Sequence, residues 1–419
     1  MDYYVFLKQE LVPAFGCTEP IAIAYCAAKC RCLLEAEPEQ IDVYLSGSMI
    51  KNANSVTVPG TKGRTGIPIS VVAGALLGDS DRELEVLEDI DTARLPECDQ
   101  KIEEGLVTIH LEPGKVGVYV DTRMKAGEKT ARVIVSQGHS HISYMEQNGK
   151  ILLNEEEEGS TEEEAPELSF HKIYDFAKTC DLSQLQEILD RQRTYNLAIS
   201  KEGLTNPWGS SIGQLILEEG SNKYSEKMAA YAAAGSDARM SGCEMPVVIN
   251  SGSGNQGITV SVPITIYAED NGVEDELRDR ALVLANLISL YIKQHIGKLS
   301  AYCGAVSAAT GAITGIGYMQ GASEEVLAQT VSNCMAGNSG IMCDGAKASC
   351  AMKIASSMRN AALCYKQAVK EKSFRSGDGI VMENVDKTVE SIGKIAREGM
   401  QGEDEIILRE MLRYNENNR

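Results

Sequence analysis

The N-terminal part of the chain carries two apolar stretches of helical length with a shorter alternating run between them. Residues 1–35 contain the run IAIAYCAAKCRCLLEA, which predicts a helix entered at residues 16–20, with Thr18 as N-cap and Pro20 in the first turn. The run IDVYLSGSMI predicts a short strand leading to Lys51 and Asn52. The turn-rich VPGTKGRTG follows as a loop, and IPISVVAGALLG then predicts a buried helix.

From about residue 85 to residue 153 the pattern changes to strict alternation. There are four strand-like runs, LVTIHLE, VGVYVDT, ARVIVSQ and HISYMEQ, and turn pairs follow three of them at Pro113-Gly114, Ala126-Gly127 and Asn148-Gly149. These runs predict an antiparallel sheet. The acidic segment NEEEEGSTEEEAPE at 154–167 predicts a solvated connection after the sheet.

Helical patterning resumes at Leu168 and dominates to the end of the chain, with many small residues in YAAAGSDARMSG and SAYCGAVSAATGAITGIG. Small side chains let helices approach closely. The predicted fold class is therefore α+β. It has an N-terminal helix, strand and loop region at 1–84 that contributes to the active site, a sheet region at 85–167 and a mainly helical catalytic domain at 168–419.

Composition narrows the class of protein. The 419 residues are 43% hydrophobic, enough for a large core and two domains. A formal charge of −20 repels nucleic acids and anionic membranes, so neither is an expected partner. The N-terminus lacks a basic segment followed by an apolar one, and no apolar stretch reaches the roughly 20 residues that span a bilayer. We therefore expect a cytoplasmic protein.

Twelve cysteines in a reducing compartment favour metal ligation, catalysis or burial over disulfides. Cys303, Cys343 and Cys350 lie among small residues, in AYCGA, MCDGAK and ASCAMK. Three thiolates without a fourth are typical of an iron-sulfur cubane that keeps one iron open. On one straight helix, Cys343 and Cys350 would be about 10.5 Å apart along the axis, too far for a compact cluster. Residues 344–346 are therefore predicted to be non-helical, with Cys350 opening the next helix.

The other cysteines carry weaker signals. Cys334 is the competing ligand, since it lies nine residues before Cys343. Free cysteine is often simply buried, and this is the expectation for Cys26, Cys30 and Cys32 on the first apolar helix. A zinc site is the other metal considered, but compact CxxC pairs are missing.

Several motifs together resemble a known family. GCTEP near the N-terminus, SGSMIKNA followed by VPGT, SGSGNQG, and CDGAKASCAMK after AYCGA resemble the L-cysteine desulfidase family, which is related to the iron-sulfur L-serine dehydratases. The resemblance spans nearly the whole chain. It implies a [4Fe-4S] cluster with one open iron and the conversion of L-cysteine and water into pyruvate, ammonia and hydrogen sulfide. By similarity, Cys303, Cys343 and Cys350 match the cluster ligands and Cys17 matches a catalytic cysteine.

Two alternatives stay open. The related serine dehydratases have proline after the central cysteine and a wider gap to the last one, whereas this chain has Cys343-Asp344-Gly345 and a shorter gap. This departure favours cysteine as substrate, with an iron-sulfur L-serine dehydratase as the alternative. A non-catalytic iron-sulfur redox sensor is an alternative of another class, and it predicts four ligands or a sealed cluster.

The elimination also needs a base. Cys17 is the first candidate, because a helix N-terminus lowers the pKa of a thiol and favours the thiolate. Lys51 is the second, either as a base or as a group that binds the substrate carboxylate. His139 and His141 in QGHSHIS would face opposite sides of a strand, so at most one of them reaches a given site.

Substrate binding is predicted at a glycine-rich segment. Its backbone amides and polar side chains suit the carboxylate and ammonium of an amino acid, and Asn52 is expected to contribute. The residues concerned are Asn250, Ser251, Gly252, Ser253, Gly254, Asn255 and Gln256. A strand, ITVSVPI, is expected to follow, which argues against a dinucleotide-binding loop. The scheme requires no PLP, and a homodimer is the default expectation for a soluble enzyme of this size.

Overall fold

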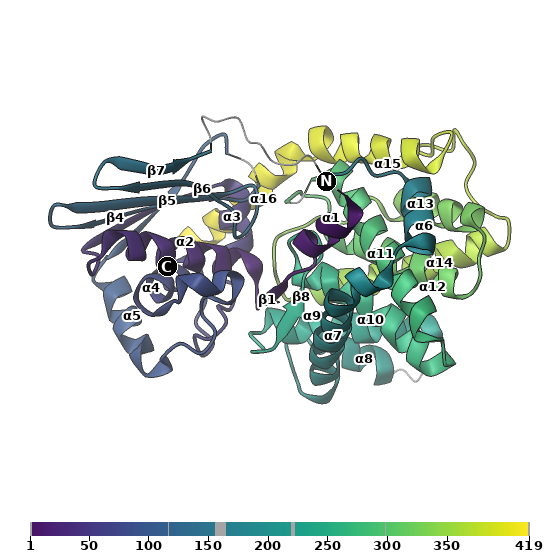
Figure 1. The fold of residues 1–419 in the computed structure, drawn as a ribbon, viewed down its shortest axis with the longest axis horizontal. Helices are drawn as coiled ribbons and strands as arrows, with labels where there is room; N and C mark the ends of the chain where they lie inside the picture. Colours follow the sequence, from purple (N-terminus) through teal and green to yellow (C-terminus); the bar gives the residue numbers. More distant parts are fainter. Residues whose placement is uncertain (1, 116, 156–164, 219–222, 298, 418–419) are drawn as a thin grey trace.

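The computed structural model describes residues 2–115, 117–155, 165–218, 223–297 and 299–417. Two lobes lie side by side (Figure 1). We call the one that holds the large sheet the sheet lobe, and the other the helical lobe. Each lobe has its own apolar core. This arrangement confirms the predicted α+β class, with its mainly helical C-terminal part.

The sheet lobe combines one six-stranded sheet with helices packed on it. Its helices are α2 (Thr18–Leu34), α3 (Gly47–Ala53), α4 (Ile67–Leu77) and α5 (Leu95–Glu103), with short 3₁₀ turns at Ser80–Glu85 and Thr92–Arg94. Its strands are β2 (Gln40–Leu45), β3 (Val107–Leu111), β4 (Tyr119–Ala126), β5 (Lys129–Ser136), β6 (Ile142–Gln147) and β7 (Lys150–Asn154).

The strand order is β3-β2-β4-β5-β6-β7. The ladders from β2 through β4 to β7 are antiparallel, as predicted for the last three of the four alternating runs. The pair β2–β3 is parallel, so the expectation of an entirely antiparallel sheet is wrong for the first run. Helix α5, which lies between these two strands in the sequence, supplies the crossover that a parallel pair needs. Residues 1–84 and 85–167 thus contribute strands to one sheet.

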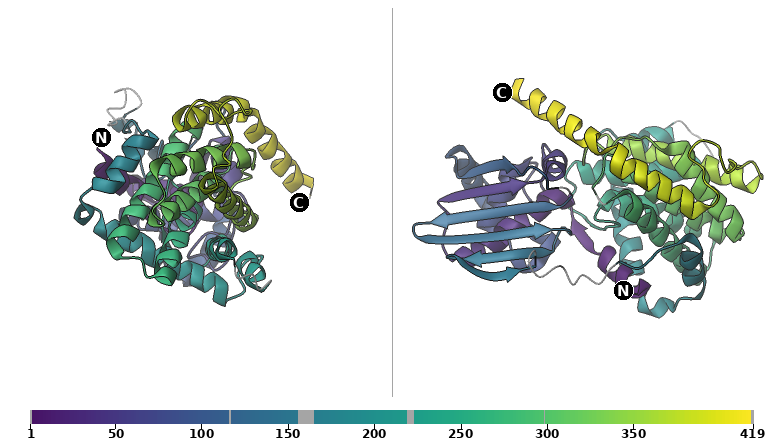
Figure 2. Two further views of the ribbon diagram at one scale, coloured as in Figure 1. Left: turned by 90° about the vertical axis from the view of Figure 1, so that its right-hand side faces the viewer. Right: turned by 90° about the horizontal axis from the view of Figure 1, so that it is seen from above.

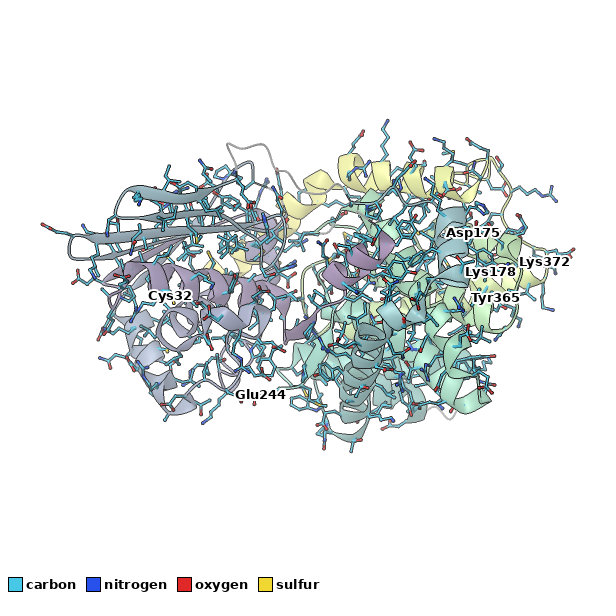
Figure 3. The ribbon with its side chains drawn as sticks, in the orientation of Figure 1. Cys32, Asp175, Lys178, Glu244, Tyr365 and Lys372 are labelled. Carbon is cyan, nitrogen blue, oxygen red and sulfur yellow. The ribbon has the colours of Figure 1, made fainter. Side chains whose placement is uncertain are left out.

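Helix α2 covers the sheet through small side chains. The thiols of Cys26 and Cys30 point to carbonyl oxygens of β4 and β5, at 3.3–3.5 Å. Both cysteines are buried, as expected for core residues. Cys32, which was expected in the core with them, is exposed on the outer side of α2 (Figure 3). The helix therefore has one cysteine on its solvent face.

The first residues belong to the other lobe. Helix α1 (Tyr3–Glu10) buries Phe6 and Leu7 in the helical core, and β1 (Pro13–Phe15) pairs with β8 (Pro246–Val248). The N-cap of α2 is Cys17, so the prediction of Thr18 as N-cap is wrong. Thr18 is already helical, and its hydroxyl donates to the carbonyl oxygen of Gly252 at 2.9 Å.

The helical lobe is built around long buried helices. Its helices are α6 (Phe170–Thr179), α7 (Gln186–Thr205), α8 (Ile212–Glu218), α9 (Tyr224–Met240), α10 (Gly254–Asn271), α11 (Asp275–Ile296), α12 (Gly304–Met319), α13 (Glu324–Asn338), α14 (Cys350–Val369) and α15 (Val385–Lys394). Glycines allow the closest contacts: a Cβ at Gly311 would lie 2.4 Å from the Ala285 carbonyl oxygen of α11. Close helix packing accounts for the small-residue density of this half.

Two segments rich in strand-forming residues are helical instead. ITVSVPI lies within α10, where nearly every side chain is buried, and the second half of IDVYLSGSMI begins α3. A helix that is buried on all sides has no polar face to reveal its period. Packing therefore decided the conformation of α10 against the local preference of its β-branched residues.

The last helix crosses between the lobes. A π-helical turn at Ile395–Gly399 leads into α16 (Gln401–Asn417), which extends from the helical lobe over α3 of the sheet lobe (Figure 2). Leu408 of α16 is buried in the core of the sheet lobe. Most of the acidic connection, residues 156–164, lies outside the described residues. Within the described chain, no helix combines the length and apolar character needed to cross a bilayer.

Candidate active site

A cavity of about 90 Å³ lies where the two lobes meet, several times the roughly 10–15 Å³ that one water requires. We call it the cysteine cavity, because Cys303, Cys343 and Cys350 all line it. Side chains from both lobes form its walls. The other polar lining residues are Thr18, Glu19, Lys51, Asn52, Arg239, Ser251, Ser253, Asn255, Gln256, Lys293, Ser300 and Tyr302.

Backbone pairing brings the first two cysteines together. Cys303 is the N-cap of α12, and its amide donates to the carbonyl oxygen of Ile341 at 2.9 Å. The amide of Cys343 donates to the carbonyl oxygen of Ala301 at 2.6 Å. These bonds hold two segments that are 40 residues apart in the sequence side by side. The cysteine thiols are close enough to form a hydrogen bond.

The third cysteine, Cys350, lies at the start of a helix, as predicted. Residues 344–346 are non-helical, and Cys350 is the first residue of α14. Its thiol lies 3.5 Å from the carbonyl oxygen of Gly345 and 3.5 Å from the amide of Lys347. The loop therefore folds back on itself to bring Cys343 and Cys350 to one cavity. Cys334, the competing ligand, is instead buried beside Cys364 in the helical core.

The three thiols have different proton affinities. A hydrogen bond from Cys303 lowers the pKa of Cys343 to about 6, and the charge of Lys51 acts in the same direction. The same hydrogen bond and burial raise the pKa of Cys303. Burial raises the pKa of Cys350 to about 11. Cys343 is thus the thiol that is most readily deprotonated.

Cys17, at the start of α2, is buried in a small cluster against which the lining residues Ala346 and Cys350 pack, and it is not itself among the residues that line the cavity. Its thiol donates to Glu19 Oε2 at 3.2 Å. Burial and the charge of Glu19 raise the pKa of Cys17 well above its usual value, so the expectation of a lowered pKa is wrong. Desolvation outweighs the helix N-terminus because the thiol is fully enclosed and a carboxylate is next to it.

Glu19 connects several groups of the site. Its carboxylate accepts a hydrogen bond from the Asn52 amide at 2.9 Å, and the Thr18 hydroxyl oxygen lies 3.1 Å from Oε2. Burial alone would raise the pKa of Glu19, but the charge of His139 and the hydrogen bond from Cys17 lower it. Glu19 is therefore a carboxylate at neutral pH, enclosed between the lobes.

The two histidines separate as predicted, although they lie in the loop between β5 and β6 and not within a strand. His139 is buried and its ring lies against Gly252, where an added Cβ would come within 2.8 Å of it. His141 pairs with Glu155 at 2.9 Å and does not line the cavity. Only His139 is near the site.

Helix α3 presents Lys51 and Asn52 to the cavity. Lys51 is almost fully buried, and its ammonium donates to the carbonyl oxygen of Cys343 at 3.1 Å. The loop at residues 339–349 carries Cys343, and we call it the cysteine loop. Its Lys347 donates to the carbonyl oxygens of Lys51 at 3.3 Å and Asn54 at 2.5 Å. The loop that carries Cys343 is therefore tied to the sheet lobe from both sides.

The glycine-rich segment forms a turn that leads into α10, not into a strand. The cavity is lined by Ser251, Gly252, Ser253, Asn255 and Gln256. Asn250 and Gly254 are not part of the wall. The Asn250 amide donates to Asn286 Oδ1 at 3.0 Å behind the cavity, and Gly254 packs on the guanidinium of Arg239.

Comparison with known proteins places the chain in a family. The sequence profile described as serine dehydratase alpha chain matches residues 81–409. The chain belongs to the serine dehydratase alpha-chain family. This finding confirms the resemblance read from the motifs, and the family implies a lyase.

Full-length relatives share the whole architecture. The UPF0597 protein of Lachnoclostridium phytofermentans is 44% identical over 408 residues, covering 97% of this chain and 98% of that protein. The UPF0597 protein of Fusobacterium nucleatum is 39% identical, covering 96% of each chain. That of Desulfitobacterium hafniense is 40% identical, covering 98% of this chain and 96% of the relative. The similarity therefore extends over the parts of the chain that form both lobes.

In this family member the cavity is electropositive, although the chain as a whole carries a formal charge of −20. Lys51, Arg239 and Lys293 line it, and among the described lining residues Glu19 is the only acid. Four helices, α2, α10, α12 and α14, begin at its wall. Helix N-termini and cations both favour anions. The cavity thus suits thiolates and a carboxylate.

The donor set fits an iron-sulfur cluster better than a single ion. In the described part of the chain, no group of three or more His, Cys, Asp or Glu side chains is placed to hold one metal ion. A cubane differs, because each cysteine binds a different iron, so the thiolates surround it instead of meeting at one atom. Three cysteines around one cavity, with no fourth among the described lining residues, match that requirement.

Sequence reasoning missed several residues of the site. Glu19 stands within the quoted motif GCTEP, and Arg239 is an isolated cation among small residues in YAAAGSDARMSG. A charged residue inside an otherwise small and apolar helix is a signal for a buried polar site. Lys293, in the last turn of a long buried helix, carries the same signal.

Proposed function

We propose that the protein is a [4Fe-4S]-dependent L-cysteine desulfidase that converts L-cysteine and water into pyruvate, ammonia and hydrogen sulfide. The observation that supports this proposal is the arrangement of Cys303, Cys343 and Cys350 around one electropositive cavity, without a fourth cysteine among the described lining residues. A cluster bound there would keep one iron without a protein ligand. When bound, it would supply a Lewis acid that stabilises the leaving sulfide.

The chain's own residues supply the setting for the elimination. The ammonium of Lys51 favours the thiolate of Cys343, and the positive ends of α12 and α14 oppose the burial that raises the pKa of Cys303 and Cys350. The small volume of the cavity limits the water around the substrate, which strengthens these electrostatic interactions. The product that leaves the site is aminoacrylate, and its conversion to pyruvate and ammonia needs water but no further side chain.

Two groups are candidates for moving the substrate Cα proton. Cys17 is protonated at rest because burial and Glu19 raise its pKa. To accept the Cα proton Cys17 must first lose its own proton, and Glu19 Oε2, to which it already donates, is the proton acceptor in contact with it. Lys51 is the other candidate, but its ammonium is already bonded to the Cys343 carbonyl oxygen. We therefore favour Cys17 as the base and Lys51 as a positioning residue.

L-serine is the second candidate substrate, and the family description is the observation that favours it. The chemistry is the same elimination with a hydroxyl in place of the thiol. The short spacing Cys343-Asp344-Gly345 to Cys350 is the feature that favours cysteine.

The test is anaerobic reconstitution with iron and sulfide, followed by steady-state assays of L-cysteine and L-serine. We expect sulfide and pyruvate in equal amounts from L-cysteine, with a higher kcat/KM than for L-serine. Absence of product from L-cysteine by a fully loaded protein would falsify the proposal. Pyruvate from L-serine alone would assign the dehydratase activity instead.

A further inference from the structure

Arg239 is a buried cation whose charge has no matching carboxylate in direct contact. Its side chain is 4% exposed and lines the cysteine cavity. In the described part of the chain no Asp or Glu forms an ion pair with it. Nη1 donates to Asn255 Oδ1 at 3.2 Å, Nη2 donates to the Gly16 carbonyl oxygen at 2.7 Å, and Nε is buried without a partner. A guanidinium therefore retains donors that no described residue uses.

The surroundings hold this guanidinium in place. A Cβ at Gly254 would lie 2.4 Å from Nε, so the first residue of α10 must be glycine for the two to pack. The bond to Gly16 anchors the same group to the segment that precedes α2. A fixed, planar guanidinium beside helix N-termini is suited to bidentate binding of a carboxylate.

Asn52 offers the complementary group on the opposite lobe. It is 6% exposed, and its Nδ2 donates to Glu19 Oε1 at 2.9 Å. A carboxylate only accepts, so this bond fixes the amide orientation and leaves Oδ1 as the other end. Oδ1 is buried without a partner among the described residues. An acceptor next to a buried carboxylate suits an ammonium group.

We propose that Arg239 binds the α-carboxylate of the substrate and that Asn52 Oδ1, with the charge of Glu19, binds its α-ammonium. This inference rests on the proposed function in that the substrate is a small amino acid. It explains why Arg239 and Asn52, each of which keeps a buried polar atom that has no partner among the described residues and is costly to bury, line the same cavity. It also assigns amino-acid recognition to both lobes at once.

The test uses two thiols that each lack one of the groups. 3-Mercaptopropionate has the carboxylate without the ammonium, and cysteamine has the ammonium without the carboxylate. Their dissociation constants are measured by calorimetry on the anaerobically reconstituted holoenzyme. Arg239→Gln should raise the dissociation constant of 3-mercaptopropionate about 10- to 100-fold and change that of cysteamine less than about threefold. Asn52→Ala should have the opposite selectivity and raise the dissociation constant of cysteamine about tenfold.

Controls separate recognition from folding. Arg239→Lys keeps the charge but loses the planar fork, so its loss of 3-mercaptopropionate affinity should be intermediate. Arg278→Gln changes another buried arginine of the helical lobe, which is paired with Asp275 and Asp279 outside the cavity, and should leave both constants unchanged. Iron content and thermal melting establish that each variant is folded and loaded.

The outcomes distinguish this inference from the proposed reaction. Three results would overturn the assignment of Arg239 and Asn52. Arg239→Gln could lower the affinity for both thiols equally, it could lower the affinity for neither, or the wild-type holoenzyme could bind neither thiol. If the opposite effects on the two thiols are observed but L-cysteine yields no sulfide, the binding assignment stands and the desulfidase reaction is wrong.

Discussion

The three cysteines of the cavity look alike in the sequence but differ in their surroundings. Cys303 donates to Cys343, and Lys51 adds positive charge near the same sulfur, so the pKa of Cys343 falls to about 6. Cys350 is held mainly by backbone groups of its own loop, and burial raises its pKa to about 11. At neutral pH one of the three thiols is therefore already prepared to bind metal, which requires a thiolate.

A serine at position 343 should prevent cluster binding. Cys343→Ser removes the most acidic thiol of the proposed ligand set, and we expect a loss of bound iron and a fall in activity of at least about 100-fold. Cys334→Ser is the control, because it makes the same chemical change in the helical lobe at a buried cysteine that lies beside Cys364 and does not line the cavity. Iron per chain and the visible absorbance after reconstitution measure the effect. Equal iron in wild type and Cys343→Ser would argue against ligation at this residue.

Two histidines should make the free energy of unfolding depend on pH in opposite directions. Burial lowers the pKa of His295, and the charge of Arg397 adds to this effect. Below about pH 6.5 the unfolded chain takes up a proton that the folded chain does not, so this histidine costs stability as the pH falls. His295→Gln should therefore make the loss of unfolding free energy from about pH 7.5 to about pH 5.5 shallower.

His171 provides the opposite sign for comparison. A hydrogen bond with Glu324 raises its pKa, so its contribution is present below about pH 6.5 and is lost as the pH rises through the folded value. His171→Gln should make the same acid-side loss steeper. Urea unfolding of the reconstituted proteins at both pH values measures the two slopes. Parallel slopes for both variants would contradict the assigned shifts.

At the scale of elements, the cysteine loop at residues 339–349 depends on its contact with α3. Lys347 and Lys51 bond across this contact in both directions. Gly345 has a φ of +95°, and an added Cβ would lie 2.8 Å from the Lys51 carbonyl oxygen and 2.9 Å from Asn52 Oδ1. The glycine is therefore required both by its conformation and by the close approach of α3.

Replacing this glycine should separate the loop from α3. Gly345→Ala should lower iron incorporation and reduce activity by roughly 10- to 100-fold, because the cavity residues would be displaced together. Gly340→Ala is the matched control, since Gly340 has a φ of +100° in the same loop but no atom within 4 Å of an added Cβ. It carries the backbone strain without the clash. If both variants lose activity equally, strain and not the contact with α3 is responsible.

At the scale of the whole molecule, the cavity joins the two lobes. Lys51 and Asn52 come from the sheet lobe, and the three cysteines and Arg239 come from the helical lobe. The β1–β8 pair and α16 also connect them. A group bound in the cavity would contact both lobes and stabilise their association, because it binds the folded arrangement and not the unfolded chain.

Removal of iron should loosen this junction first. We expect a chelator to lower the melting temperature and to increase hydrogen exchange in α3 and at the start of α14, while the far edge of the sheet, β6 and β7, exchanges as before. Anaerobic hydrogen-exchange mass spectrometry of loaded and iron-free protein makes the comparison. A uniform increase across both lobes would show that the metal affects global stability and not this junction.

Local patterns in the sequence determined much of this architecture. The alternation of β4 to β6 and the long apolar helices reflect burial on one face or on all sides, which is visible in neighbouring residues. The prediction that residues 344–346 break the helix before Cys350 followed from helix geometry together with the expectation that Cys343 and Cys350 bind one compact cluster. The three cysteines stood out because of their small neighbours, and the structure brings them to one cavity.

Only the tertiary structure decided the other features of the fold and the site, because these features depend on contacts between groups distant in the sequence. The β-branched residues of α10 became helical because they are enclosed by other helices, and β3 became parallel to β2 because α5 returns the chain to the same edge. The raised pKa of Cys17 comes from burial between lobes beside Glu19. Arg239 became a candidate for carboxylate binding because none of the acids in the described part of the chain forms an ion pair with it, and charge pairing across long sequence distances is set by packing.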